Sequence, residues 1–427
     1  MTGDTATTGT AAAGDVPATR RAVVTGISAI APSASGANDF WEAVLAARNG
    51  LGPITRFAAD DFPVPVVGEV QGPEVVPGVD PRLVLQTDRW SQFALRAADE
   101  ALRDANLDPT DFNPYDLGVI TASSSGGNAF GQREIQALWS KGPRYVGPYQ
   151  SIAWFYAATT GQLSIRHGMQ GPCGVAVAEQ AGGLDAIGLA RSAVLRGDAR
   201  AVLTGGTEAP LSPYALTCQL TSGRLSTGTD PGRAYLPFDA GAAGHVPGEG
   251  GAILVLESSD GAADRGAGTP YGEIAGHAAT FDPPPGVPAA PGPSPLRRAI
   301  ELALADAGLT PADVDVVLAD AAGTRELDRA EAACLSEVFG PYGVPVTAPK
   351  AGYGRLYAGG APLDVVTALL ALRHQIIPPT GGAVTVDPEH RIDLVGDPRA
   401  ADLRTALVIA RGYGGFNSAV VVRAVSA

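Results

Sequence analysis

The stretch from Gly171 to Gly197 constrains the fold of this 427-residue chain more than any other. Its first part is small and apolar, which predicts a short buried strand, and its second part has apolar residues on one face, which predicts a helix. The two meet at Glu179-Gln180. A strand that runs directly into a glycine-rich helix start is typical of a nucleophile elbow, where the residue at the bend faces a cleft. We place Gln180 at that bend, although a carboxamide is not a nucleophile.

Strands and helices alternate along the rest of the chain, which predicts an α/β fold with parallel sheets covered by helices. A glycine pair at 205–206 reads as a turn, and 282–295 as a proline-rich loop. Predicted strands cover 21–25, 117–122, 200–204, 251–256, 271–279, 314–319, 406–410 and 419–424, and predicted helices cover 39–48 (with Asn38 as the cap), 83–106, 129–140, 150–166, 296–307, 326–339 and 360–374.

The sequence predicts two similar halves. Gly182-Gly183 with Leu184-Asp185 opens one helix, and Gly359-Gly360 with Leu363-Asp364 opens another, each followed by a strand, a glycine-rich turn and a closing strand. This pattern indicates a duplicated βαβ-type unit with a site between the halves. We expect a disordered tail at 1–19, an N-terminal half at 20–262 and a C-terminal half at 263–427.

The amino-acid composition indicates which partners are unlikely and which cellular compartment to expect. The net charge of −14 without any Lys/Arg cluster argues against nucleic acid or an anionic membrane. The start of the chain lacks a signal peptide, and no apolar run reaches the roughly 18 residues that span a bilayer. Three cysteines and five histidines show no ligand-like spacing, so we expect no metal and a reducing cytoplasm. Cys173 is expected to be a small buried thiol ahead of the strand.

Four ordered motifs resemble those of the β-ketoacyl synthases of the thiolase superfamily, over about 21–425. This resemblance implies a thiolase-like fold with mixed sheets and layered helices. The motifs are Pro237-Phe238-Asp239 followed by Pro247 to Ala252 (PFD…GEGA), Gly323-Thr324 with Asp328 and Glu331 (GT…DxxE), Lys350 with Gly354 (KxxxGH), and Gly412 to Asn417 (GFGG).

The resemblance also implies a site with a Cys nucleophile, two His and a Lys. In this chain the Cys position holds Gln180, the first His position holds Asp320, the second holds Arg355, and Lys350 is retained. No catalytic set is therefore intact. We expect Asp320 and Arg355 to form an ion pair across the unused cleft, with Lys350 hydrogen-bonded beside it. Gln180 either fills space at the helix start or forms a local hydrogen bond through its amide.

The segment AEQAGGLDA, with Gln at the elbow, resembles the chain-length factor, or β subunit, of bacterial type II polyketide synthases. That resemblance implies a heterodimer with a Cys-bearing ketosynthase α subunit, no cofactor, and substrate carried on the phosphopantetheine arm of an acyl carrier protein. It also implies a substrate tunnel at the interface, with Asn128, Gly131 and Ile135 on one helix face. Their modest size predicts a roomy tunnel and a long product, a decaketide or longer, unless these residues merely pack the partner.

Two other functions stay open on the sequence. One is a decarboxylase that acts on malonyl carrier protein to supply the acetyl primer. The other is a thiolase-like homodimer with a relocated nucleophile, for which the sequence offers no candidate. Starter unit, cyclisation pattern and final metabolite leave no mark in the sequence.

Overall fold

The strands of the computed structural model form two half-sheets with the same internal order. The structure describes residues 20–59, 62–73, 76–283, 292–382 and 384–425. The order along the ladder is β14-β12-β11-β16-β17-β10-β1-β9-β8-β6-β7. The first half contains β1 (Ala22–Ile27), β6 (Leu117–Ala122), β7 (Cys173–Ala176), β8 (Ala201–Glu208) and β9 (Gly250–Ser258). The second contains β10 (Gly272–Phe281), β11 (Val316–Leu318), β12 (Pro345–Thr347), β14 (Asp393–Leu394), β16 (Thr405–Gly412) and β17 (Phe416–Arg423).

The pairing directions repeat between the halves, as the duplication predicts. In the first, β6 is parallel to β7 and β8, while β9 runs antiparallel between β8 and β1. In the second, β11 is parallel to β12 and β16, while β17 runs antiparallel between β16 and β10. The halves join where β1 pairs antiparallel with β10. Both sheets are therefore mixed rather than purely parallel.

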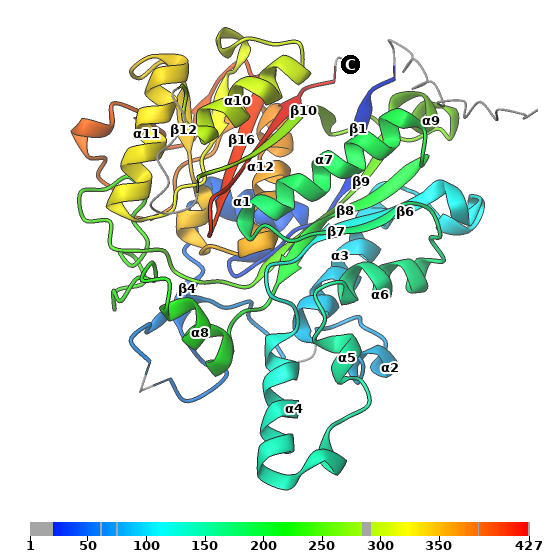
Figure 1. Cartoon of the computed structure of the whole chain (residues 1–427). Helices are drawn as coiled ribbons and strands as arrows, with labels where there is room; N and C mark the ends of the chain where they lie inside the picture. The colour runs from blue at the N-terminus through cyan, green and yellow to red at the C-terminus, as the bar shows by residue number, and fades with distance from the viewer. Residues whose placement is uncertain (1–19, 60–61, 74–75, 284–291, 383, 426–427) are drawn as a thin grey trace, which may run out of the picture.

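Helices separate and cover the two half-sheets (Figure 1). The central pair, α7 (Gln180–Arg196) and α12 (Gly360–His374), pack on each other and contact strands of both halves. Because α12 is apolar almost all round, its residues from Gly360 to Leu372 are all buried. Outside the first half lie α3 (Arg89–Asp104) and α6 (Ala158–His167), and outside the second lies α10 (Pro295–Asp306) with α11 (Arg325–Phe339) beside it.

Two further helices project from this layered body, as Figure 1 shows: α4 (Asn128–Lys141) and the short α5 (Gln150–Ala153). Within the described ranges no helix is both long and apolar enough to cross a bilayer. The remaining elements are α1 (Ala37–Leu45), α2 (Pro81–Val84), α8 (Pro213–Leu220), α9 (Ser259–Asp264), β2 (Ile30–Ala31), β3 (Ala34–Ser35), β4 (Leu51–Pro53), β5 (Val66–Gly68), β13 (Ile376–Ile377) and β15 (Arg399–Ala400).

Several predicted boundaries were wrong. The helix predicted at 83–106 is split, because the side chain of Asp88 accepts a hydrogen bond from the backbone N–H of Trp90 and starts α3 anew. The helix predicted at 150–166 is likewise split into α5 and α6, and α1 begins after Gly36 without a cap from Asn38. The predicted turn at 205–206 lies inside β8. The predicted tail at 1–19, and 284–291 of the proline-rich loop, lie outside the described residues.

Candidate functional site

The turn between β7 and α7 has the shape of a nucleophile elbow, but its strained residue is Glu179. Glu179 has φ 51° and ψ −130°, and such conformations cost an L residue about 1–3 kcal/mol unless the surroundings hold them. Gln180, which we placed at the bend, is instead the first residue of the helix. That placement was wrong by one residue, because the sequence pattern does not reveal which residue of a tight turn takes the positive φ.

Gln180 is completely buried and hydrogen-bonds within the site. Its Nε2 donates to Oδ1 of Asp320 at 3.2 Å, which confirms the expected local hydrogen bond. Its Oε1 has no hydrogen-bond partner among the described residues and lies beside Gly360, where an added Cβ would stand 3.3 Å away. This carboxamide has no proton that it could lose near neutral pH.

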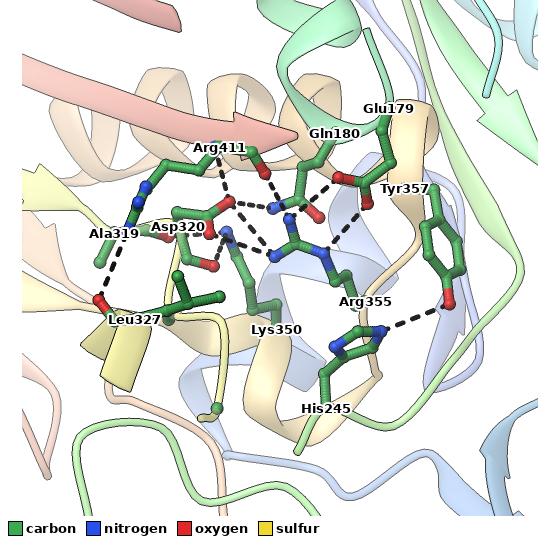
Figure 2. A network of polar contacts seen from close by, with 12 residues as sticks. Glu179, Gln180, His245, Ala319, Asp320, Leu327, Lys350, Arg355, Tyr357 and Arg411 are labelled. Carbon is green, nitrogen blue, oxygen red and sulfur yellow. Dashed lines mark hydrogen bonds and ion pairs between the residues drawn. The ribbon is translucent and has the colours of Figure 1, made fainter. Parts of the chain in front are cut away.

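The Arg355 guanidinium lies between two carboxylates, as Figure 2 shows. Its Nη1 lies 3.2 Å from Oδ1 of Asp320, and its Nε lies 3.2 Å from Oε1 of Glu179. Its Nη2 also donates to the backbone carbonyl of Arg411. The expected ion pair between Asp320 and Arg355 is therefore present, and Glu179 joins it. Burial disfavours the ionised form of Asp320, but the charges of Arg355 and Lys350 outweigh it and lower the pKa of that carboxyl.

Lys350 lies behind this cluster and is held by three oxygens. Its Nζ donates to the backbone carbonyls of Ala319 at 2.6 Å and Asp320 at 3.3 Å, and it pairs with Asp364 at 2.6 Å. Burial raises the pKa of Asp364 to about 6 despite the lysine. The expected hydrogen bonding of Lys350 beside the ion pair is confirmed.

The acidic residues of the GT…DxxE motif hold the loop that carries Asp320. Glu331 accepts hydrogen bonds from the backbone N–H groups of Asp320 at 2.8 Å and Ala321 at 3.0 Å. Asp328 accepts from the backbone N–H groups of Gly323 at 2.9 Å and Phe238 at 2.8 Å. Burial raises the pKa of Asp328 to about 7 and that of Glu331 to about 8. This motif is therefore scaffolding, and it fixes the backbone that carries Asp320.

A cavity of about 710 Å³ opens in front of the ionic cluster. Glu179, Asp320 and Arg355 line its floor, and His245 and Tyr357 line one wall. The Tyr357 hydroxyl donates to Oε1 of Gln219 and lies 3.4 Å from Nε2 of His245. Burial and the charge of Arg355 lower the pKa of His245 well below its usual value, so the imidazole is neutral at physiological pH. No cluster of metal-ligand residues occurs in the described ranges.

Two cysteines of the described chain, Cys173 and Cys218, are exposed. Cys218 lines the cavity from α8 and hydrogen-bonds to Tyr214 one turn earlier. Cys173 is exposed at the start of β7, which corrects the expectation of a buried thiol ahead of the strand. Its strand lies at the end of the sheet, so its apolar pattern does not imply burial in the single chain. Partial desolvation of the Cys173 thiol still raises its pKa, which favours the less reactive protonated form.

The three predicted tunnel residues occupy different environments on α4. Asn128 is buried, lines the cavity and donates from Nδ2 to Oγ of Ser125 at 2.6 Å. Gly131 is buried under the indole of Trp154, and Ile135 is exposed. Of the three, only Asn128 appears among the residues that line the cavity.

Sequence reasoning missed four residues of this site: Glu179, His245, Trp154 and Tyr357. Glu179 directly precedes Gln180, so an acidic side chain at the predicted bend was the one sequence signal that could have found it. The other three come from distant segments and carry no local pattern that marks them as cavity residues. Tyr357 has φ 51°, a left-handed conformation that is rare for a tyrosine and that only the structure reveals.

Comparisons with known proteins identify the fold and the family. Two family models match: "Beta-ketoacyl synthase, N-terminal domain" over residues 19–262 and "Beta-ketoacyl synthase, C-terminal domain" over residues 271–383. The tetracenomycin polyketide synthase ketoacyl synthase beta subunit of Streptomyces glaucescens is 56% identical over 402 residues, which cover 94% of this chain and 98% of that protein. The actinorhodin polyketide putative beta-ketoacyl synthase 2 of Streptomyces coelicolor is 55% identical over 405 residues, with the same two coverages of 94% and 98%.

The solved structure of the ishigamide ketosynthase/chain length factor is also similar, with a TM-score of 0.86 and 26% identity over 96% of this chain and 100% of that one. The duplicated half-sheets and the elbow thus define a thiolase-like protein of the condensing-enzyme type, as the sequence predicted. The chain belongs to the β-ketoacyl synthase family, and within it to the ketosynthase β subunits of type II polyketide synthases.

Proposed function

We propose that this chain is a non-catalytic chain-length factor, which forms a heterodimer with a ketosynthase α subunit and shapes the tunnel for the growing polyketide. One observation carries the proposal: the nucleophile position holds a buried amide, bonded to an ion pair that fills both histidine positions. Condensation needs a thiolate that carries the acyl chain, and a buried amide cannot replace it. Decarboxylation needs donors that stabilise an enolate oxyanion, and an ionised Asp320 opposes that charge.

An apolar face around the sheet edge supports the heterodimer. Within the described ladder β7 pairs with β6 and leaves its other side open, which is a ready template for a strand of another chain. Contiguous exposed apolar side chains on a soluble protein mark interaction surfaces. Several segments that follow β6 carry exposed apolar side chains: Ile135 and Trp139 on α4, Trp154, Phe155 and Tyr156 after α5, Ile165 on α6, Val177 between β7 and α7, and Leu189 on α7.

The tunnel is proposed to run along α4. This helix projects from the body, and its Asn128, Gly131 and Ile135 positions follow one face. With no large aromatic at those three positions, we expect a long poly-β-ketone chain. The partner would supply the nucleophilic Cys and receive substrate on the phosphopantetheine arm of an acyl carrier protein. The net charge of −14 makes this subunit a poor electrostatic match for an acidic carrier, which supports docking through the partner.

Cysteine usage supports a cytoplasmic location for the complex. Cys173, Cys218 and Cys334 are all free thiols, and exposed free thiols persist in a reducing compartment.

The test is reconstitution with a ketosynthase α subunit, malonyl-loaded acyl carrier protein and a matched α subunit whose nucleophilic Cys is replaced by Ala. We expect polyketide only when this chain and the intact α subunit are both present. Condensation by this chain alone, or with the Cys-to-Ala partner, would overturn the proposal.

The same reaction mixtures test the two alternatives. Release of carbon dioxide from malonyl carrier protein by this chain alone would indicate a decarboxylase. An acyl-thioester trapped on Cys218 would indicate a relocated nucleophile. We expect neither. The carboxylates of Glu179 and Asp320 line the cavity where the enolate of a decarboxylation would form, and they disfavour that negative charge.

A further inference from the structure

The space above Gly131 is filled by the indole of Trp154. A Cβ added at residue 131 would stand 2.7 Å from Cδ1 of that indole, closer than Cβ atoms approach other heavy atoms in folded proteins. The glycine therefore does not leave a void on this face of α4. It allows an aromatic ring from another segment to lie directly against the helix backbone.

The backbone of Trp154 is fixed to the start of α4. The N–H of Gly127 donates to the Trp154 carbonyl at 3.1 Å, and a Cβ on Gly126 or Gly127 would collide with the carbonyls of Trp154 or Ala153. The buried Asp88 accepts from the N–H of Phe130 at 2.7 Å and anchors the same helix end to the body. The position of the indole is thus set by two clamped backbones, and 47% of the residue is exposed in the single chain.

Trp154 also lines the 710 Å³ cavity, together with Asn128 from the first turn of α4. Gly131 contacts the indole and is absent from the cavity wall. The indole therefore stands between the middle of the α4 face and the cavity left by the lost active site. The cavity lining combines apolar side chains, among them Val177, Leu327 and Phe416, with the hydroxyls of Ser124, Ser125 and Tyr214.

We propose that Trp154 is the specificity-determining residue of this subunit, whose indole covers the middle of the α4 face at Gly131 and limits how far a poly-β-ketone chain extends. The cavity behind it is the space that the chain enters when the indole is removed. A poly-β-ketone chain suits such a space, because its carbonyls accept hydrogen bonds from hydroxyl and amide donors while its methylenes pack on apolar walls. This inference rests on the proposed chain-length function and corrects the simpler view that the smallness of Gly131 sets the length.

The test uses the heterodimer with its α subunit and acyl carrier protein, and compares products by mass spectrometry. We expect Trp154→Ala to lengthen the product by at least one two-carbon unit or to broaden the length distribution. Gly131→Ala displaces the indole, so it should change the distribution in the wild-type background and have no effect in the Trp154→Ala background. Leu302→Ala removes an exposed apolar side chain from α10, away from both the cavity and the proposed interface, and should leave product length unchanged.

The outcomes separate this inference from the proposed function. If the wild-type heterodimer makes no polyketide, the chain-length function itself fails. If the wild type makes a product of defined length and Trp154→Ala makes the same product at the same rate, the inference is overturned. Additive effects of Gly131→Ala and Trp154→Ala would overturn it as well. If size-exclusion chromatography shows that Trp154→Ala no longer assembles, Trp154→Leu keeps an apolar cover for the partner and tests the same prediction.

Discussion

Replacing Arg355 with Met should destabilise the folded chain by about 3–5 kcal/mol, because it strands a buried carboxylate. The Arg355 side chain is 6% exposed, and that of Asp320 is 1% exposed. Without the guanidinium, Asp320 keeps the amide of Gln180 and the backbone N–H of Arg411 at 2.9 Å, but it loses its nearest opposite charge. Glu179 is more accessible and can turn towards solvent, so Asp320 carries most of the cost.

A double-mutant cycle measures this cost directly. Unfolding of the wild type, Arg355→Met, Asp320→Asn and the double variant is followed by circular dichroism in urea and on heating. The double variant should recover part of the loss, with a coupling energy of about 1–3 kcal/mol. Arg329→Met is the matched control. Its ion pair with Glu389 is 68% and 72% exposed, and its loss should cost less than about 1 kcal/mol.

The pH dependence provides an independent check. Since the folded-state pKa of Asp320 lies below its unfolded value, its contribution to stability is present above the unfolded pKa of about 3.9 and is lost as the pH falls through the folded pKa. In Arg355→Met this loss should begin at a higher pH, because the arginine charge that favours the carboxylate is gone. A loss below about 1 kcal/mol for Arg355→Met, or strictly additive effects in the cycle, would refute this account of the cluster.

Three shorter predictions concern other parts of the molecule. Gln180→Cys should give no acyl-enzyme by mass spectrometry after incubation with acyl carrier protein, because Asp320 remains where a histidine is needed; an acylated cysteine would contradict this. Burial raises the pKa of Glu208 to about 8, so the wild type loses stability as the pH rises from about 4.5 towards 8. In Glu208→Gln the melting temperature should depend less on pH over that window, and equal slopes of melting temperature against pH in the two proteins would contradict this. Leu189→Lys on the proposed interface should raise the dissociation constant for the α subunit by at least about tenfold, or 1.4 kcal/mol, whereas Leu302→Lys on α10 should not; equal titration curves for the two variants would remove this face from the interface.

The sequence predicted the arrangement of the fold because its main signals are local. The spacing of apolar residues and of glycines was enough to predict α7, α10, α11 and α12 and the strands around them. The broken helices needed long-range information. Asp88 receives N–H groups from both Trp90 and Phe130, and the second of these lies 42 positions away. A helix pattern across residue 88 gives no sign of that contact.

The glycine pair at 205–206 was misread for a similar reason. A Cβ on Gly205 would meet the carbonyl of Ala252, and one on Gly206 would lie 2.6 Å from the carbonyl of Ala358. These glycines permit close approach of neighbouring backbones inside a sheet rather than a turn. In the site, the family motifs placed Gln180, Asp320 and Arg355 correctly in one cluster. Glu179 and Trp154 escaped, because their roles depend on a backbone conformation and on a contact between distant segments.

The charge cluster at the elbow has an evolutionary consequence. Glu179 and Asp320 share the single guanidinium of Arg355, so a change of Arg355 to histidine leaves the buried Asp320 carboxylate without its nearest opposite charge, at a cost of about 3–5 kcal/mol. That is a large share of the 5–15 kcal/mol that keeps a typical protein folded. A variant that gains a thiol at position 180 and a histidine at position 355 therefore passes through an intermediate with a lower free energy of unfolding, unless Asp320 changes at the same time.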